Sequence, residues 1–576
     1  MQRAMLTLST VLLAFAAMCG LATAAPLSSY AAGPITASPS DRLVPAALRP
    51  VLERSLDIDS VTGAWLEQRV VAGDGAQTDQ FGYAVAVSGT TALVGSKYAV
   101  INGHGQEGAV YVFTESNGIW SFTQKLTAVD GTNTRWFGHS IAFDGTTALI
   151  CAPGTTVDGI NVAGEVYVFT FSGGAWTQTQ ELTSEDGEAN GVFGNTVTMD
   201  GGTAFVGSSN ATIDGVAGQG AAYVFTNSGG TWNQTQKLVS DDGGTGDSFA
   251  QSIGLSGTTA VIASPVSNVN GNFAAGAAYV FNESGGVWDQ SQKLTIAGGA
   301  VFDLFATTVV LQGTTALISD QSAVDGNAQQ GAVYVFTESG GTWTQAQKLV
   351  SDDGLPTDEF GWSMVLDGSR AFIGTPQNIP NSSATGNPGK VYLFTQSAGI
   401  WSQADIISPS DAQADELFGV SVAFDDAFLL SGALGNNTYQ GAAYFYTAPS
   451  SPPVANITPR SLSFTVIAGA TGSDTLTISN SGDADLTFTL GEAVADCSNP
   501  TDVSWLSETP VSGSVAGGAS QDVTVTADAT GLDPGDYSAL LCVTTNDPNN
   551  GLIQIPVSLA VGPDDTIFKD GFDGTP

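Results

Sequence analysis

The fold of this chain is decided by a recurring stretch, one copy of which, residues 165–182, reads EVYVFTFSGGAWTQTQEL. Its tryptophan recurs with a period of 55 to 58 residues, at 65, 120, 176, 232, 288, 343 and 401. A phenylalanine follows each tryptophan, at 81, 137, 193, 249, 305, 360 and 418. A tyrosine follows each phenylalanine, at 111, 167, 223, 279, 334, 392 and 444. Three landmarks in constant order, repeated seven times, indicate a repeat protein.

Each repeat is predicted to contain four short strands. In one copy, residues 137–143 alternate in polarity before the turn at Asp144-Gly145, and residues 148–152 form an apolar second strand. The third strand covers residues 165–170, and the fourth begins at Trp176 after a glycine-rich turn. Four strands per repeat of this length are typical of a propeller blade, so we predict an all-β fold.

The two ends of the repeat array indicate how the ring closes. The array begins with a lone fourth strand, residues 65–71, and ends with three strands between Phe418 and Thr447. Together these make one complete blade. Pairing them removes the exposed sheet edges that favour aggregation. We therefore predict a closed seven-bladed propeller over residues 63–447.

The repeats resemble FG-GAP repeats, the blades of the integrin α-subunit head and of many exported bacterial proteins. Phe-Gly at five of the seven phenylalanine positions carries the resemblance, from which Phe249-Ala250 and Phe305-Ala306 depart. The family binds calcium in a DxDxDG-type loop between the first two strands of a blade. Here that place holds tight turns such as residues 88–91, which cannot supply six or more oxygen ligands. The family's calcium site is therefore not transferred to this chain.

Beyond a Pro-rich linker at 448–456, alternating runs predict about seven strands and an immunoglobulin-like β-sandwich over residues 457–562. Residues 504–507 (SWLS) and 545–548 (TNDP) resemble BACON or HYDIN-type modules, which implies a spacer or a surface-binding unit. Cys497 and Cys542 share this module and are expected to pair in an oxidising compartment. Cys151 lies in an apolar strand and is expected to be a buried, inert thiol.

The N-terminus has the pattern of a secretory signal peptide over residues 1–24: Arg3, an apolar run to Leu21, and Ala22-Thr23-Ala24 before the cleavage point. A linker follows at 25–62, in which residues 43–56 could form an amphipathic helix. In the C-terminal tail at 563–576, residues 565–573 (DTIFKDGFD) resemble a short tail motif of secreted proteins, which implies a sorting signal. The alternative is a frayed terminus. We expect a secreted or cell-surface protein with no transmembrane segment in the mature chain.

The charge balance is strongly acidic, with 15 Lys and Arg against 55 Asp and Glu and a formal net charge of −40. Such a surface repels phosphate backbones and anionic lipids, so we expect no nucleic-acid partner and no membrane-surface binding. We also expect a monomer.

Acidic residues concentrate in the connections that follow each tryptophan strand. The candidate metal ligands are Asp186, Asp241, Asp242, Asp352 and Asp353, with calcium as the cation to test and no other cofactor expected. In the alternative, which we favour, these acids lie in solvated turns and bind no ligand. They recur because the repeat was duplicated, and Asp and Gly are common in turns for conformational reasons. The connections out of strands two and four are the long ones, and they should share one face of the ring.

Signatures of enzymes are scarce in the sequence. The two histidines, His104 and His139, have no Ser or Cys partner in local sequence, and no HExxH, GxSxG, P-loop or CxxC motif is present. We expect a non-enzymatic binding or adhesion protein that uses the loop-rich propeller face for an unknown protein or glycan ligand. The alternatives are a carbohydrate-active or other hydrolytic enzyme that uses two carboxylates of that face, and a structural matrix component.

Overall fold

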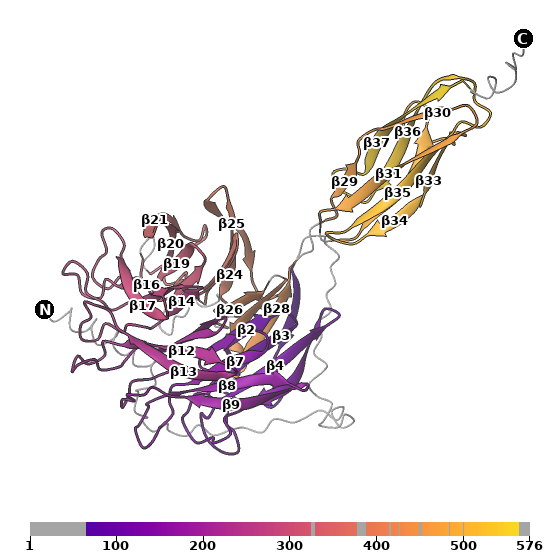
Figure 1. The fold of residues 1–576 in the computed structure, drawn as a ribbon. Coiled ribbons are helices and arrows are strands. Elements are labelled where there is room, and N and C mark those ends of the chain that lie inside the picture. The colour runs from indigo at the N-terminus through magenta and orange to yellow at the C-terminus, as the bar shows by residue number, and fades with distance from the viewer. Residues whose placement is uncertain are drawn as a thin grey trace, which may run out of the picture. The chain divides into compact units, whose positions relative to one another are not determined.

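A computed structural model describes residues 65–323, 329–376, 388–413, 416–425, 427–448, 452–482, 484–498 and 500–563. The predicted signal peptide, the linker with its amphipathic helix, and residues 564–576 of the predicted tail lie outside the described residues. The described chain consists mainly of strands, in seven four-stranded sheets followed by a β-sandwich (Figure 1). The predicted all-β class and the seven-bladed propeller are confirmed.

Six blades are formed by consecutive strands. Blade 1 comprises β2 (Phe81–Ser88), β3 (Thr91–Ser96), β4 (Ala109–Ser116) and β5 (Ile119–Leu126). Blade 2 comprises β6 (Ile141–Phe143), β7 (Thr147–Ala152), β8 (Glu165–Ser172) and β9 (Ala175–Leu182). Blade 3 comprises β10 (Val197–Asp200), β11 (Thr203–Ser208), β12 (Ala221–Ser228) and β13 (Thr231–Leu238). Blade 4 comprises β14 (Ile253–Ser256), β15 (Thr259–Ser264), β16 (Ala277–Ser284) and β17 (Val287–Leu294). Blade 5 comprises β18 (Val309–Gln312), β19 (Thr315–Asp320), β20 (Ala332–Ser339) and β21 (Thr342–Leu349). Blade 6 comprises β22 (Ser363–Asp367), β23 (Arg370–Thr375), β24 (Lys390–Ser397) and β25 (Ile400–Ile407).

Blade 7 closes the ring with strands from both ends of the array. It comprises β26 (Phe418–Asp425), β27 (Phe428–Ala433), β28 (Ala442–Thr447) and β1 (Leu66–Val70), with the short helix α2 (Asn436–Tyr439) before β28. β1 pairs antiparallel with β28, Leu66 opposite Thr447 and Val70 opposite Ala443. β2 of the first blade lies beside β26 of the last (Figure 1). The predicted closure is thus confirmed, and it leaves β28 paired on both sides.

The first strand of five blades begins later than the sequence predicts. In blade 2, residues 137–140 precede β6, and Gly138 among them has a positive φ of 88°. The phenylalanine instead bonds to the neighbouring blade: the Phe137 amide donates to the Glu107 carbonyl at 2.9 Å. All seven phenylalanine amides make the equivalent bond, so the Phe-Gly landmark belongs to the joint between two blades.

A glycine before each third strand completes this joint. The seven have φ from 84° to 91°, and a Cβ built on any of them would lie 2.0–2.5 Å from the phenylalanine carbonyl oxygen of the next blade: Gly108, Gly164, Gly220, Gly276, Gly331, Gly389 and Gly441. Glycine alone permits both the positive φ and the close backbone approach.

The glutamine-rich outer strands form a second set of joints. The Gln236 side-chain amide donates to the Trp288 carbonyl at 2.7 Å and accepts from the Trp288 amide at 2.9 Å. Gln68, Gln124, Gln180, Gln292 and Gln347 bond in the same way to the tryptophan of the following blade. Between blades 6 and 7, Asp405 stands at the glutamine position and accepts a bond from Trp65 Nε1 at 3.1 Å.

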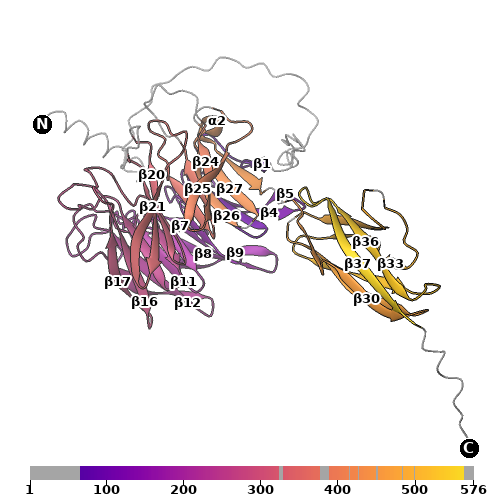
Figure 2. The ribbon, with the colours of Figure 1, turned by 90° about the horizontal axis from the view of Figure 1, so that it is seen from above.

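The C-terminal module has nine strands in two sheets, where about seven strands were predicted (Figure 2). One sheet contains β29 (Ala455–Thr458), β31 (Thr471–Asn480), β35 (Ser520–Asp528) and β33 (Leu506–Thr509). The other contains β30 (Leu462–Ile467), β37 (Leu552–Gly562), β36 (Gly535–Thr545), β32 (Leu486–Ala493) and β34 (Ser512–Val515). Three of the nine strands, β29, β33 and β34, have four residues each, too short for a clear alternation.

The sandwich has a hydrophobic core between its two sheets and one disulfide. Its core is filled by the inward side chains of both sheets, among them Leu476, Val523 and Leu541. Cys497 and Cys542 form a disulfide. β29 begins at Ala455, within the predicted linker at 448–456, and pairs with β31.

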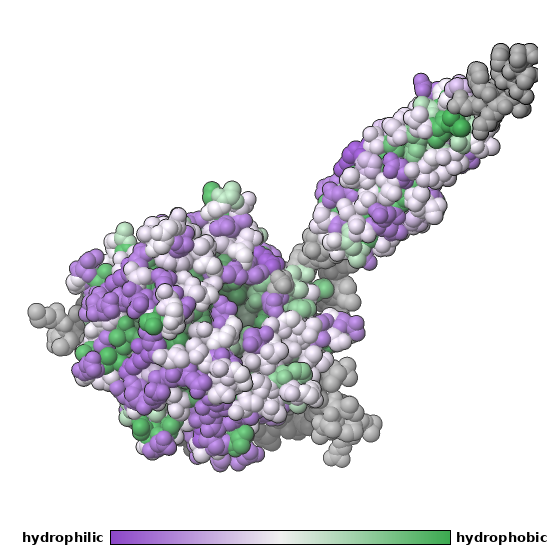
Figure 3. Space-filling view, viewed as in Figure 1, coloured by the Kyte–Doolittle hydropathy of each residue, from purple (hydrophilic) through white to green (hydrophobic). Residues whose placement is uncertain are grey.

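The remaining cysteine is buried, and the described propeller surface carries no large apolar patch in the view shown. Cys151 is fully buried in β7. In the view of Figure 3, hydrophobic patches on the propeller are small and scattered among hydrophilic residues. Among the described residues, no helix has the length and apolarity needed to cross a bilayer.

Candidate functional site

The two kinds of long loop meet on one face of the ring, as predicted. The loop from strand two to strand three of one blade accepts hydrogen bonds from the loop that enters the next blade. Between blades 1 and 2, the Thr134 amide donates to the Gly105 carbonyl at 2.9 Å and the Trp136 amide to the Gln106 carbonyl at 3.1 Å. We call the surface formed by these loops the loop face. The opposite ends of the blades carry tight turns, and we call them the turn face.

The acids of the loop face are engaged in a repeated contact with tyrosine and a cation. Tyr223 donates to Asp186 Oδ1 at 2.8 Å, and Lys237 Nζ lies 2.5 Å from Asp186 Oδ2. Tyr279 and Lys293 hold Asp242 at 2.7 Å each. The same contact joins Tyr111, Tyr167, Tyr392 and Tyr444 to Asp74, Asp130, Asp353 and Asp411, with Lys125, Arg135, Lys390 and Arg69 as the cations.

This contact keeps the aspartates ionised. Burial alone would raise the pKa of Asp186, but the hydrogen bonds from Lys237 and Tyr223 outweigh it, and the pKa is lowered overall. The pKa values of Asp74, Asp242 and Asp353 are lowered in the same way. Burial raises the pKa of each partner tyrosine, which therefore stays a hydrogen-bond donor at all physiological pH values.

The five predicted metal candidates therefore lie in three separate loops. Asp186, Asp242 and Asp353 each bind their own tyrosine and lysine. Asp241 and Asp352 have exposed side chains, and their amides donate to Gln290 and Gln403 of the next blade at 3.2 and 3.1 Å. Within the described ranges, no three His, Cys, Asp or Glu side chains gather as they would around a metal ion.

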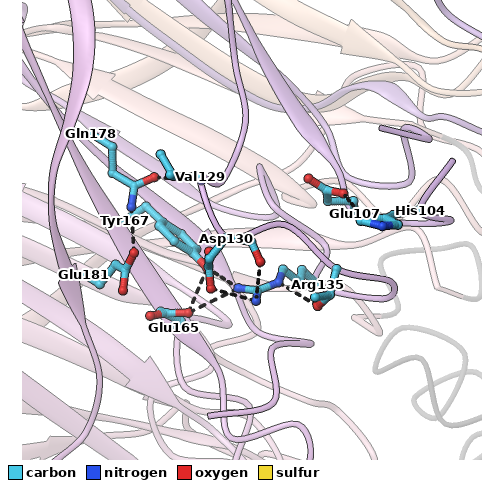
Figure 4. A network of polar contacts seen from close by, with 10 residues as sticks. His104, Glu107, Val129, Asp130, Arg135, Glu165, Tyr167, Gln178 and Glu181 are labelled. Carbon is cyan, nitrogen blue, oxygen red and sulfur yellow. Dashed lines mark hydrogen bonds and ion pairs between the residues drawn. The ribbon is translucent and has the colours of Figure 1, made fainter. Parts of the chain in front are cut away.

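Blade 2 replaces the lysine of this contact by an arginine from another position (Figure 4). Glu181 stands where Lys237 and Lys293 stand in blades 3 and 4, opposite the tyrosine. Arg135 supplies the cation: its Nη2 lies 2.7 Å from Asp130, its Nη1 3.5 Å from Glu165, and it donates to the Tyr167 hydroxyl. Tyr167 in turn donates to Glu165 at 2.8 Å. Burial raises the pKa of Glu165 to about 7, and the bond from Tyr167 opposes that rise.

Asp320 and Glu359 of the propeller have strongly raised pKa values. Asp320, at the end of β19, is 1% exposed, and burial followed by the charge of Asp303 raises its pKa to about 7. Burial also raises the pKa of Glu359 to about 7. Asp320 Oδ1 and Glu359 Oε2 have no hydrogen-bond partner among the described residues. Burial is the main cause of both pKa shifts, and neither carboxyl contributes to the shift of the other, so they do not act as a coupled pair.

The two histidines lie in different surroundings. His104 Nδ1 is 2.9 Å from Glu107 Oε2, and Glu107 is 2% exposed. The His139 ring packs against Tyr83 with centroids 5.1 Å apart. Burial, followed by the charge of Lys97, lowers the pKa of His139 well below its usual range, so the ring is neutral.

A surface pocket of about 510 Å³ opens on the loop face where blades 7 and 1 meet. It is lined by Thr78, Gln80, Tyr98, Val100, Gly105, Gln106 and Tyr439. Tyr439 comes from the loop before β28 and is 48% exposed. The Gln80 amide donates to the Tyr439 carbonyl at 3.0 Å, which ties the two walls together.

Side chains vary at fixed backbone positions of the loop face. The residue before each phenylalanine has φ between 55° and 60°, and the seven are Gln80, Trp136, Val192, Ser248, Leu304, Glu359 and Leu417. The residue two before each joint glycine has φ between 52° and 64° in six blades, and these are Gln106, Val162, Gly218, Ala274, Gln329 and Tyr439. A bulky residue at positive φ is uncommon, yet the ring keeps this backbone in every blade whatever the side chain.

Comparisons with known proteins support the prediction of seven repeats. All seven repeats match the family described as FG-GAP repeat, at residues 65–113, 120–169, 176–225, 232–281, 288–336, 343–394 and 401–446. The chain belongs to the FG-GAP repeat family. Residues 454–555 match the family described as Viral BACON domain. In this FG-GAP repeat protein, the predicted propeller and the BACON-type module are thus both confirmed.

Solved structures resemble a small part of this FG-GAP repeat protein. A PapD-like domain of human CEP192 is 20% identical, with 21% of this chain and 91% of that chain covered and a TM-score of 0.17. WR4, a C. elegans MSP family member, is 14% identical, with 19% of this chain and 97% of that chain covered and a TM-score of 0.14. None of the curated proteins compared with the chain matches it.

Several features of the loop face escaped the sequence prediction. The sequence prediction uses the tyrosine of each repeat as a landmark, yet in six repeats its hydroxyl donates to an acid 33 to 39 residues earlier. A sequence signal existed, since Asp74, Asp130, Asp186 and Asp242 each precede their tyrosine by 37 residues. The pocket had no such signal, because its residues come from both ends of the propeller sequence.

Proposed function

We propose that this FG-GAP repeat protein is a non-enzymatic binding or adhesion protein that acts outside the cell or at its surface. Its ligand, a protein or a glycan, is held by the loop face of the propeller. The observation that carries this proposal is the variation of side chains at backbone positions that the ring keeps constant. A rigid scaffold with varied surface loops is the usual design of a binding surface.

The other repeated residues have structural roles. Among the varied loop-face side chains, Gln106 and Tyr439 are exposed, whereas Trp136, Val192 and Ala274 are buried. The joint glycines, the outer glutamines and the aspartate–tyrosine contacts each connect strands or blades. The aspartates that contact a tyrosine are therefore engaged in the fold, whereas Asp241 and Asp352 keep exposed side chains. The engaged aspartates favour binding over hydrolysis by a carboxylate pair. The disulfide of the sandwich and the secretory pattern of residues 1–24 support an oxidising, extracellular location.

Binding can be assigned to one face with matched substitutions. The purified mature chain would be tested by surface plasmon resonance against immobilised neutral oligosaccharides, collagen, fibronectin and laminin. Val129→Arg and Ala189→Arg place an exposed cation on the loop face, and Ser116→Arg and Ser172→Arg place one on the turn face. We expect the loop-face pair to weaken binding by roughly tenfold or more and the turn-face pair to leave it unchanged. Loss of binding in the turn-face variants alone, or hydrolysis of a bound oligosaccharide, would overturn the proposal.

A further inference from the structure

We infer that the pocket at the junction of blades 7 and 1 is a binding site for a neutral saccharide. This inference rests on the proposed function and names the ligand class for one place on the loop face. The pocket of about 510 Å³ lies within the range of small-molecule sites, roughly 300–1,000 Å³. Its lining has two tyrosine rings, two glutamine amides and one threonine hydroxyl.

The lining is uncharged although the chain carries a net charge of −40. The acids next to it in sequence are turned into the fold: Asp79 is 4% exposed and accepts the Ala76 amide at 2.8 Å. Glu107 is 2% exposed and pairs with His104. The pocket therefore offers no carboxylate to a cation, and the acidic surroundings repel an anion. A neutral ligand is the class that remains.

The donor set suits the hydroxyls and the apolar ring faces of a sugar. A glutamine amide both donates and accepts, as a sugar hydroxyl does, and the Gln106 side chain is exposed. A tyrosine ring offers an apolar face with a polar end. Tyr439 is 48% exposed, so its ring is accessible to a ligand.

Hydrogen bonds and a cation–π contact fix the walls of the pocket in the absence of a ligand. Lys97, itself 5% exposed, places Nζ 4.8 Å from the Tyr98 ring centroid and 3.4 Å from that of Tyr83. The Trp136 amide holds the Gln106 carbonyl, and the Gln80 amide holds that of Tyr439. Preorganised walls reduce the entropy lost on binding. Because Tyr439 precedes the last strand of the array and the other residues belong to blade 1, the site is complete only when the ring is closed.

The test is isothermal titration calorimetry of the full mature chain with neutral hexasaccharides of glucose, xylose, mannose and N-acetylglucosamine, and with hexagalacturonate as the charged counterpart. Tyr439→Ala removes the exposed ring, Tyr439→Phe keeps it, and Phe273→Ala removes another exposed aromatic ring of the loop face as the matched control. We expect at least one neutral hexasaccharide to bind, with roughly tenfold or greater loss in Tyr439→Ala and near wild-type affinity in the other two variants.

Three results would overturn the inference: no neutral hexasaccharide binds, hexagalacturonate alone binds, or Tyr439→Ala binds as tightly as the wild type. In each case the proposed function stands if the loop-face arginine variants still lose a protein or glycan ligand. It falls as well if they do not. Circular dichroism of Tyr439→Ala shows whether a loss of binding comes from the missing ring or from unfolding.

Discussion

Single residues at the joints between blades show how closely the backbones of this ring approach one another. Gly220 and Gly230 have nearly the same φ, 89° and 90°. A Cβ on Gly220 would lie 2.2 Å from the Phe249 carbonyl oxygen, whereas one on Gly230 would meet nothing within 4 Å. The two positions therefore separate the effect of close packing from that of conformational freedom.

We predict that Gly220→Ala lowers the free energy of unfolding by about 3–5 kcal/mol, because the new methyl group forces the joint apart and the positive φ is strained. Gly230→Ala carries the strain alone and should cost about 1 kcal/mol. Chemical denaturation of both variants gives the comparison. Equal losses would show that the approach of Gly220 to the next blade is not a tight joint.

A buried carboxyl in blade 5 predicts a dependence on pH. Ser96, Ser208 and Ser264 donate their hydroxyls to a loop carbonyl, and Asp320 stands at the same place of its blade. Its folded-state pKa of about 7 lies above the ordinary value of 3.8. The folded chain therefore binds this proton more tightly than the unfolded chain, and stability present below pH 4 is lost as the pH rises to about 7.

Asp320→Asn should remove this loss because asparagine does not titrate. Relative to the wild type, we predict that the variant gains stability between pH 4 and pH 8, by up to about 4 kcal/mol. Urea denaturation across that range measures the gain, with the exposed Asp158→Asn as a control that should follow the wild type. Parallel profiles for Asp320→Asn and the wild type would contradict the assigned role of Asp320.

At the scale of elements, the outer strands bind the next blade through side chains rather than through a ladder. Gln236 of β13 makes two bonds to the backbone of Trp288 in β17. We predict that Gln236→Ala lowers the free energy of unfolding by about 1–3 kcal/mol, since it leaves two partly buried backbone groups without this partner. Asn233→Ala, exposed on the same strand, should change it by less than about 0.5 kcal/mol. Thermal unfolding checks both, and equal effects would refute the role of Gln236.

The strands were predictable from sequence, and the joints between them were not. Alternation and turn residues place β7 and β8 within two residues of their observed ends, because both patterns act along one strand. The pairing of the first strand with the last was also predictable, because the lone strand at the start of the array and the three strands at its end add up to one four-stranded blade. The contact of Asp242 with Tyr279 and Lys293 could not be deduced in this way, since it joins a loop to strands of the next blade, 37 and 51 residues later.

The candidate site was predictable only as a surface. Two long loops per blade were enough to place it on one face of the ring. The pocket itself needs Tyr439 beside Gln80, two residues that are 359 positions apart in the sequence and meet only because the ring closes. Repetition along the chain gives the shape of each blade but does not say which side chains face one another across the closure.

At the scale of the whole molecule, closure by β1 is the feature on which the propeller and its pocket both depend. We predict that a chain beginning at Ala72, which lacks β1, exposes the edge of β28, melts at a lower temperature and forms oligomers through that edge. A chain beginning at Trp65 retains β1 and serves as the control. Size-exclusion chromatography and thermal unfolding compare the two, and identical behaviour would show that β1 does not close the ring.

We infer that the repeated carboxylates hold the ring together and leave ligand binding to the varied side chains of the loop face. The most direct test is thermal unfolding of the mature chain in chelator, in excess calcium and in excess magnesium. A single native-state site at a hundredfold excess of calcium over its Kd would add about 2.7 kcal/mol of stability. We predict that the melting temperature is the same in all three conditions. A rise in calcium that magnesium does not reproduce would contradict the claim and make the acidic loops metal sites.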